Sequence, residues 1–236
     1  MAFGHGSATD VYVGGYDLTG YLNAVTMAGQ ADVAETTTFG NTAKTYIPGL
    51  KDGTVQAEGY FDGVADAVDQ VLAAALGAAT VNWTVMPQGD TVGSPAKGFS
   101  TVGTSYEVES PVDGATTITA EGQSVVGMEK GLVAHALAAR TANGTGTALD
   151  NSTSSASGGA GYLHVTAFSG FSGVVVLLEH STDNVTYATL GTFATVDAAR
   201  DNERIAFTGT VNRYVRAKWT VTGSGSITFH VTFVRK

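Results

Sequence analysis

Cysteine is absent from this sequence of 236 residues, proline occurs four times, and charged residues make up only 14% of the chain. The lack of cysteine excludes disulfide frameworks, thiolate metal sites and cysteine nucleophiles. Disordered chains are usually rich in proline and charge, so the low content of both argues against disorder over most of the chain. Apolar runs stay below the ~18 residues of a membrane-spanning helix, and the first residues, MAFGHGSATD, lack a signal-peptide pattern. We therefore expect no membrane segment and no secretion signal.

Glycine and threonine are abundant, with 31 and 33 residues, which favours tight turns and pleated strands. Apolar and polar residues alternate with period two in many segments, for example 55–61, 102–109 and 227–233. The sequence therefore predicts a mainly β protein. We expect an N-terminal β-sandwich or barrel, followed by a C-terminal antiparallel β-sandwich of jelly-roll or immunoglobulin-like type.

One segment departs from this alternation. Between Asp62 and Gly77, apolar residues recur at the spacing of a helical face. Asp is a residue type that often caps the N-terminus of a helix, as Asp62 would here. Gly often follows the C-terminus of a helix, as Gly77 would here. This pattern predicts one helix over about 63–76.

Charge divides the chain into two halves. Residues 1–127 hold three lysines, no arginine and 14 acidic residues, whereas residues 128–236 hold nine basic and seven acidic residues. A stretch rich in the small residues Ala, Gly, Ser and Thr begins near Gly127–Lys130. The sequence thus predicts a first domain over 1–127 and a second over 128–236, which either face different environments or are modules that drifted apart in composition.

No strong catalytic motif is present, and we expect no enzyme activity, no metal and no cofactor. His164 and His230 are predicted on the outer, solvent-facing sides of strands, without the carboxylates or further histidines of a metal site. Glu107 and Glu109 share one strand face, which favours an acidic surface over a glycosidase pair.

The segment 38–53, TFGNTAKTYIPGLKDG, carries bulky apolar residues without a clean period. It is predicted to be a long loop between strands at 33–37 and 54–61. Such a loop either folds over its own core or buries its apolar groups against a partner.

Three motifs in this region resemble the major tail (tail tube) proteins of long non-contractile-tailed bacteriophages. They are ETTTFG at 35–40, KTYIPGLKDG at 44–53 and EGYFDG at 58–63. The likeness covers roughly residues 1–125. It includes the single helix and an early hairpin, which is predicted from two short strands, 11–13 and 16–19, around the turn Gly14-Gly15. The second half is similar, more loosely, to the β domains that such proteins append at the C-terminus.

The resemblance implies a tail-tube-like first domain whose copies form homohexameric rings, stacked into a virion tail tube through which DNA passes without specific binding. It implies a long loop contacting the adjacent ring, and partners among other tail proteins (terminator, tape measure, baseplate), with assembly in the bacterial host cytoplasm. The implied inter-ring contact residues are Phe39, Lys44, Tyr46, Ile47, Pro48 and Leu50. A negatively charged lumen would repel DNA and leave it free to slide. Candidate lumen residues are Asp10, Asp17, Glu35, Glu58, Glu107, Glu109 and Glu121.

Two alternatives stay open. The second domain would be a carbohydrate- or cell-surface-binding module if Tyr162, Tyr187, Tyr214 and Trp219 formed a stacking platform for a host glycan. The alternation places Trp219 inside the domain, which favours a core role. The other alternative is a capsid decoration protein.

Overall fold

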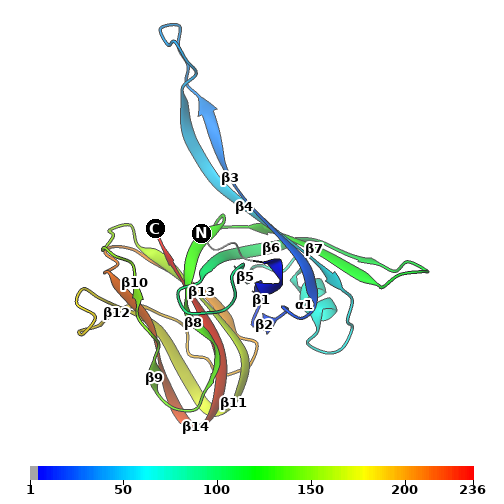
Figure 1. The fold of residues 1–236 in the computed structure, drawn as a ribbon, viewed down its shortest axis with the longest axis vertical. Coiled ribbons are helices and arrows are strands. Elements are labelled where there is room, and N and C mark those ends of the chain that lie inside the picture. The colour runs from blue at the N-terminus through cyan, green and yellow to red at the C-terminus, as the bar shows by residue number, and fades with distance from the viewer. Residues whose placement is uncertain (1–4) are drawn as a thin grey trace. The chain divides into compact units, whose positions relative to one another are not determined.

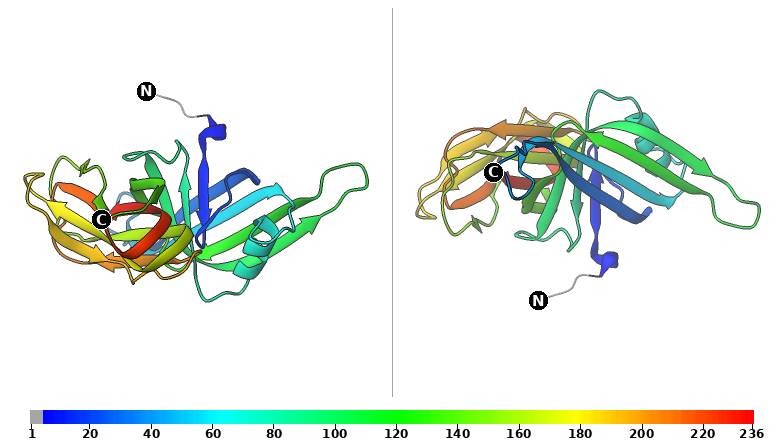
Figure 2. Two further views of the ribbon diagram at one scale, coloured as in Figure 1. Left: turned by 90° about the horizontal axis from the view of Figure 1, so that it is seen from below. Right: turned by 90° about the horizontal axis from the view of Figure 1, so that it is seen from above.

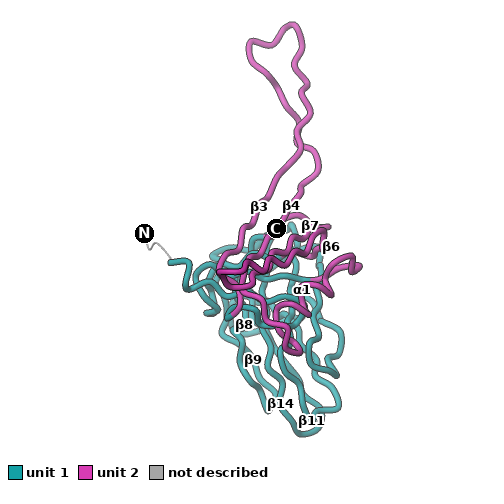
Figure 3. The backbone as a smooth tube through the Cα atoms, turned by 90° about the vertical axis from the view of Figure 1, so that its right-hand side faces the viewer, with its two compact units in different colours: residues 1–20, 82–98, 130–236 teal, residues 21–81, 99–129 magenta. Residues whose placement is uncertain are grey.

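The computed structural model describes residues 5–236, which fold mainly into antiparallel β-strands (Figure 1). This confirms the predicted mainly β fold. The chain forms two compact units (Figure 3). Unit 1 comprises the chain up to Gly20, Asn82–Gly98 and Lys130–Lys236, and unit 2 comprises Tyr21–Val81 and Phe99–Glu129.

Unit 1 holds a short 3-10 helix, Gly6–Ala8, and most of the strands. These strands are β1 (Asp10–Val13), β2 (Tyr16–Asp17), β5 (Val81–Met86), β8 (Glu129–Arg140), β9 (Gly144–Thr145), β10 (Leu149–Asp150), β11 (Gly159–Ser181), β12 (Ala188–Thr192), β13 (Asn202–Phe207) and β14 (Tyr214–Arg235).

Unit 2 is built from β3 (Leu22–Glu35), β4 (Tyr46–Tyr60), α1 (Val68–Ala75) and β7 (Thr117–Ser124), together with most of β6 (Pro95–Glu109). Its strands pair antiparallel in the order β3-β4-β7-β6.

The first hairpin of unit 1 follows from two glycines. Gly14 and Gly15 have φ of 54° and 82°, the left-handed values that a two-residue hairpin turn requires and that glycine adopts without strain. They join β1 to β2. A Cβ at Gly15 would also lie 2.6 Å from the carbonyl oxygen of Arg200, so this position has no room for a side chain.

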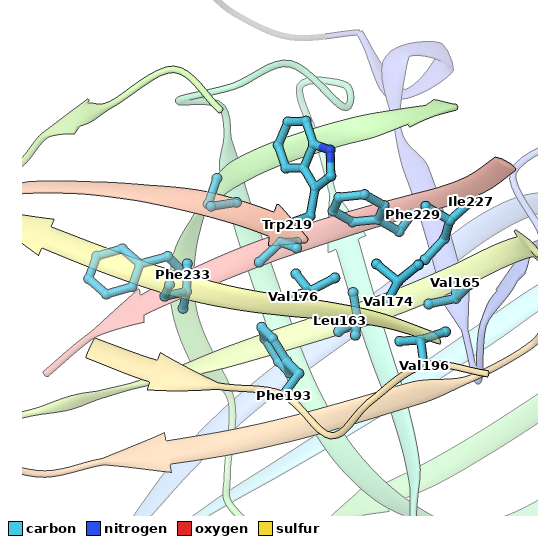
Figure 4. Packing of buried hydrophobic residues seen from close by; sticks show 14 of the residues in the cluster. Leu163, Val165, Val174, Val176, Phe193, Val196, Trp219, Ile227, Phe229 and Phe233 are labelled. Carbon is cyan, nitrogen blue, oxygen red and sulfur yellow. The ribbon is translucent and has the colours of Figure 1, made fainter. Parts of the chain in front are cut away.

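The core of unit 1 lies around the two longest strands, β11 and β14 (Figure 4). They pair along nearly their whole length, with bulges near Val165, Ser169 and Phe171, and bulges bend strands. Residues on both sides of these bends, such as Leu163 and Val176, belong to one buried cluster with Trp219 and Phe229. The strands thus curve around a shared core, and Trp219 lies inside it as its alternation predicts.

The sheet of unit 2 has two different faces. Val55, Ala57, Ile118 and Ala120 are buried and share one face, because paired residues of antiparallel strands point the same way. The helix α1 lies on this side, beside β6 (Figure 2). The Gly77 N–H donates to the Gly103 carbonyl oxygen, and a Cβ at Gly103 would meet the backbone of Ala75. The opposite face is polar.

The predicted helix exists but is shorter than predicted, spanning Val68–Ala75 rather than 63–76. Asp62 does not act as its N-cap. Its side chain instead accepts the N–H of Val64 in a turn, and Asp66 has a φ of 65°, which interrupts a right-handed helix. The end was predicted correctly, since Gly77 follows the C-cap with a φ of 70°.

The compact units differ from the predicted division into 1–127 and 128–236. One seam, between Glu129 and Lys130, lies close to the predicted boundary, but the chain up to Gly20 and Asn82–Gly98 group with the C-terminal part. Long-range pairing explains this, because β1 pairs with β5 and Asp90 hydrogen-bonds to His230.

Candidate assembly surface

The most exposed part of unit 2 is the outer half of the hairpin formed by β3 and β4 (Figures 1 and 3). The two strands pair from Leu22 opposite Gly59 to Glu35 opposite Tyr46. Every residue over 29–52 is exposed except Thr45, which is half-buried. We call residues 31–51 the outer hairpin.

The outer hairpin corrects the prediction of a long loop over 38–53. Only residues 36–45 connect the strands, and the rest of the segment belongs to β4. Alternation fails as a signal here because both faces of the ladder are exposed, so burial imposes no period of two. Pro48, Gly49 and Gly53 all lie in the part of β4 that belongs to this segment, and such residues are typical of loops.

Short polar side chains hold the tip of the outer hairpin in one shape. The Thr36 N–H donates to the Thr45 carbonyl oxygen at 2.8 Å. Asn41 Oδ1 accepts the backbone N–H of Thr38 at 2.8 Å and its hydroxyl at 2.6 Å. Below the tip, Lys44 and Glu35 form an exposed ion pair at 3.0 Å. Phe39, between these bonds, is fully exposed.

The residues predicted as inter-ring contacts all lie on the outer hairpin. Among the apolar ones, Leu50 is 80% exposed, Ile47 55% and Tyr46 51%, while Lys44 and Pro48 are also exposed. Soluble monomers rarely display so many large apolar groups together. In a single chain these side chains are exposed to solvent.

Four of the predicted lumen residues share the polar face of the unit 2 sheet. Glu58 and Glu107 both pair with Thr119, Glu121 pairs with Gln56, and Glu109 follows Glu107 at a spacing of two. All four glutamates are exposed. The side of the sheet opposite α1 therefore carries a concentrated negative charge.

The other three predicted lumen residues lie elsewhere. Glu35 is in the hairpin ion pair, and Asp17 accepts the N–H of Thr19. Asp10 belongs to unit 1, where its carboxylate accepts the N–H of Asp90 at 2.6 Å. Burial raises the pKa of Asp10 above its usual value, against the lowering effect of that bond.

The prediction for His164 and His230 was wrong, because both are fully buried in unit 1. Thr84 on β5 hydrogen-bonds His164 at 2.8 Å, and Asp90 hydrogen-bonds His230 at 3.0 Å. Tyr12 on β1 donates to the same carboxylate. The outer side of these strands is covered by β1 and β5, a long-range contact that alternation within one strand does not report.

Burial lowers the pKa of His164 to about 3, with a further contribution from neighbouring His230. Its Nδ1 has no hydrogen-bond partner among residues 5–236. Burial also tends to raise the pKa of Asp90, but the hydrogen bond and charge of His230 together with the N–H of Leu137 hold it below its usual value. His164, His230 and Thr84 in this network are fully buried, and its hydrogen bonds tie β5 and Asp90 to β11 and β14.

The four aromatic residues considered for a glycan platform do not form one exposed surface. Tyr162 and Trp219 are buried, and Trp219 donates to the Ala142 carbonyl oxygen. The rings of Tyr187 and Tyr214 are covered by the guanidinium groups of Arg216 and Arg213, at 3.6 and 4.8 Å from the ring centroids.

Within residues 5–236, no three His, Asp or Glu side chains are grouped so that they could hold a metal ion. No helix in the described part of the chain has the length and apolar character to cross a membrane.

No protein-family model matches this chain, and no curated protein sequence matches it. Among solved structures, it is similar to a chain in the virion of a native gene transfer agent particle, with 12% identity, a TM-score of 0.43, and coverage of 53% of this chain and 97% of the other. It is also similar to the Dit protein of phage SPP1, with 14% identity, a TM-score of 0.38, and coverage of 96% and 99%. A chain of the phage p2 baseplate gives 10% identity, a TM-score of 0.33, and coverage of 97% and 98%.

Proposed function

We propose that this chain is a structural protein of a bacteriophage tail and acts by self-assembly rather than catalysis. More specifically, we propose that it is the tail tube subunit, forming homohexameric rings that stack into a tube. The sequence motifs over 35–63 support the family, and the exposed apolar side chains of the outer hairpin carry the proposal.

The argument from the outer hairpin is energetic. Fully burying one side chain such as Phe, Leu or Ile is worth roughly 1.5–3 kcal/mol relative to leaving it exposed. Phe39, at the tip, gains none of this in a single chain, and Ile47 and Leu50, on the two-stranded ladder, gain only part of it because no core covers them. A second copy would supply the missing contact.

The polar face of the unit 2 sheet supports a conduit for DNA. In the proposed ring this face, with Glu58, Glu107, Glu109 and Glu121, lines the lumen and repels the phosphate backbone. Residues 128–236 decorate the exterior. The partners are other copies and other tail proteins, and the location is the virion tail.

Shortening the hairpin tests this function. Replacing residues 31–51 by Asn-Gly joins Gln30 to Asp52, which already face each other in the ladder, through a favoured two-residue turn. No buried side chain is removed, so we expect the same cooperative unfolding and thermal midpoint as for the full chain. In negative-stain micrographs we expect stacked rings or tubes from the full chain, and none from the shortened chain.

Two results would contradict the proposal. A full chain that stays dispersed at every concentration would exclude self-assembly. Tubes of normal length from the shortened chain would show that the outer hairpin is not the stacking contact.

A further inference from the structure

All positive charge of unit 2 lies on the outer hairpin. The unit contains twelve acidic residues but only two basic ones, Lys44 and Lys51. Both lysines are exposed and lie among the apolar residues Phe39, Tyr46 and Leu50. The outer hairpin also carries Asp32 and Glu35, and Lys44 pairs with Glu35. It is therefore an apolar surface that is neutral overall, on a unit that is otherwise strongly acidic and has no other basic residue.

A second exposed apolar surface lies at the opposite end of β4. We call residues 60–66 the base segment. Within it Val64 is 66% exposed, Tyr60 55% and Phe61 41%. The base segment carries Asp62 and Asp66 and no basic residue. It is acidic, whereas the outer hairpin is neutral overall and holds the two lysines of the unit, and both surfaces are apolar.

The base segment is held in a fixed shape, as a receptor surface needs to be. The Phe61 N–H donates to the Thr116 carbonyl oxygen at 3.0 Å, and the Ala67 N–H donates to that of Val64 at 3.0 Å. A Cβ at Gly63 would lie 3.3 Å from the Phe61 ring, so this ring rests over the backbone.

The two surfaces cannot meet within one chain. They lie at the two ends of β4, a strand of 15 residues, and a strand rises about 3.3 Å per residue, which places its ends more than ~40 Å apart. The tip beyond Tyr46 extends further still from the base segment (Figure 1). Any contact between them is a contact between copies.

We propose that the outer hairpin of one copy docks on the base segment of a second copy. This rests on the proposed self-assembly and names the receiving surface. The contact buries Phe39 against Phe61 and Val64, and brings Lys44, which pairs with Glu35 in the single chain, near Asp62. Because the two surfaces differ, the contact is head-to-tail, and repeating it along the axis of β4 extends an open polymer instead of closing a dimer.

The absence of cysteine allows a direct test by cross-linking. Gly40→Cys places a thiol next to Phe39 at a position where a Cβ meets nothing within 4 Å, and Ala65→Cys places one next to Val64 on an exposed residue. The two single variants of the full chain are mixed, allowed to assemble and treated with a short bismaleimide. We expect a covalent dimer in the mixture, at least tenfold more abundant than in either variant alone.

Val112→Cys provides the matched control, because Val112 is fully exposed on the β6–β7 hairpin of the same unit. Mixed with Gly40→Cys, it should give no more dimer than Gly40→Cys alone. Assembled particles without the Gly40–Ala65 cross-link would overturn the docking but not the self-assembly. More dimer from the Gly40–Val112 mixture than from the Gly40–Ala65 mixture would do the same. A chain that forms no particles would overturn both.

Discussion

The buried histidines His164 and His135 make the stability of unit 1 depend on pH. Burial, with the positive charge of Arg140, lowers the pKa of His135 to about 4, and burial lowers that of His164 to about 3. Both values lie below the ~6.5 of an unfolded histidine. Below pH 6.5 the unfolded chain therefore binds protons that the folded chain does not, and stability falls as the pH drops towards the folded pKa values.

This difference predicts acid sensitivity. From the two pKa values, lowering the pH from 7.5 to 5 should cost about 2 kcal/mol of unfolding free energy for each histidine. Urea unfolding followed by tryptophan fluorescence measures this loss. In His164→Gln the stability at pH 7.5 falls, because Thr84 loses its present partner, but the loss between the two pH values should shrink by about 2 kcal/mol. An unchanged pH dependence in this variant would contradict the account.

At the scale of the element, the sequence predicted those features that depend on local rules. Gly14-Gly15 predicted the first hairpin, and Gly77 predicted where α1 ends. The start of α1 was misplaced because Asp62 bonds within a turn instead of capping the helix. The strand pairing of the outer hairpin was not predicted. No core covers either face of this hairpin, so its strands lack the alternation of apolar and polar residues that burial imposes.

The polar face of the unit 2 sheet leads to a second prediction. If Glu107 and Glu121 line a lumen, assembled tubes should not retain duplex DNA, since like charges repel it. Tubes of the Glu107→Lys, Glu121→Lys double variant should retain it, with an affinity that falls steeply as salt rises. The measurement is co-sedimentation of a short duplex before and after nuclease treatment.

Nuclease protection distinguishes the lumen from the outer wall. DNA held inside a tube survives the nuclease. DNA held by Asp197→Lys, a charge reversal at an exposed residue of the part proposed to decorate the exterior, should be digested. Retention of DNA by unsubstituted tubes, or digestion of the DNA held by the double variant, would argue against an acidic lumen.

At the scale of the whole molecule, composition alone could not define the units. The change in charge near residue 128 lies next to a real seam, but β6 contributes residues to both units. Contacts such as Asp90 with His230, 140 residues apart, assign 82–98 to unit 1. The exposed residues of the outer hairpin, by contrast, were identified from the sequence. They are bulky and apolar in a segment where apolar and polar residues do not alternate regularly, and recognising this requires no long-range information.

An electron cryomicroscopy reconstruction of particles formed by the purified full chain tests self-assembly through the outer hairpin most directly. We predict sixfold rings in which Phe39 and Leu50 of every copy are buried against a neighbouring ring. Particles whose hairpin tips project into solvent, or a preparation that contains only single chains, would contradict it.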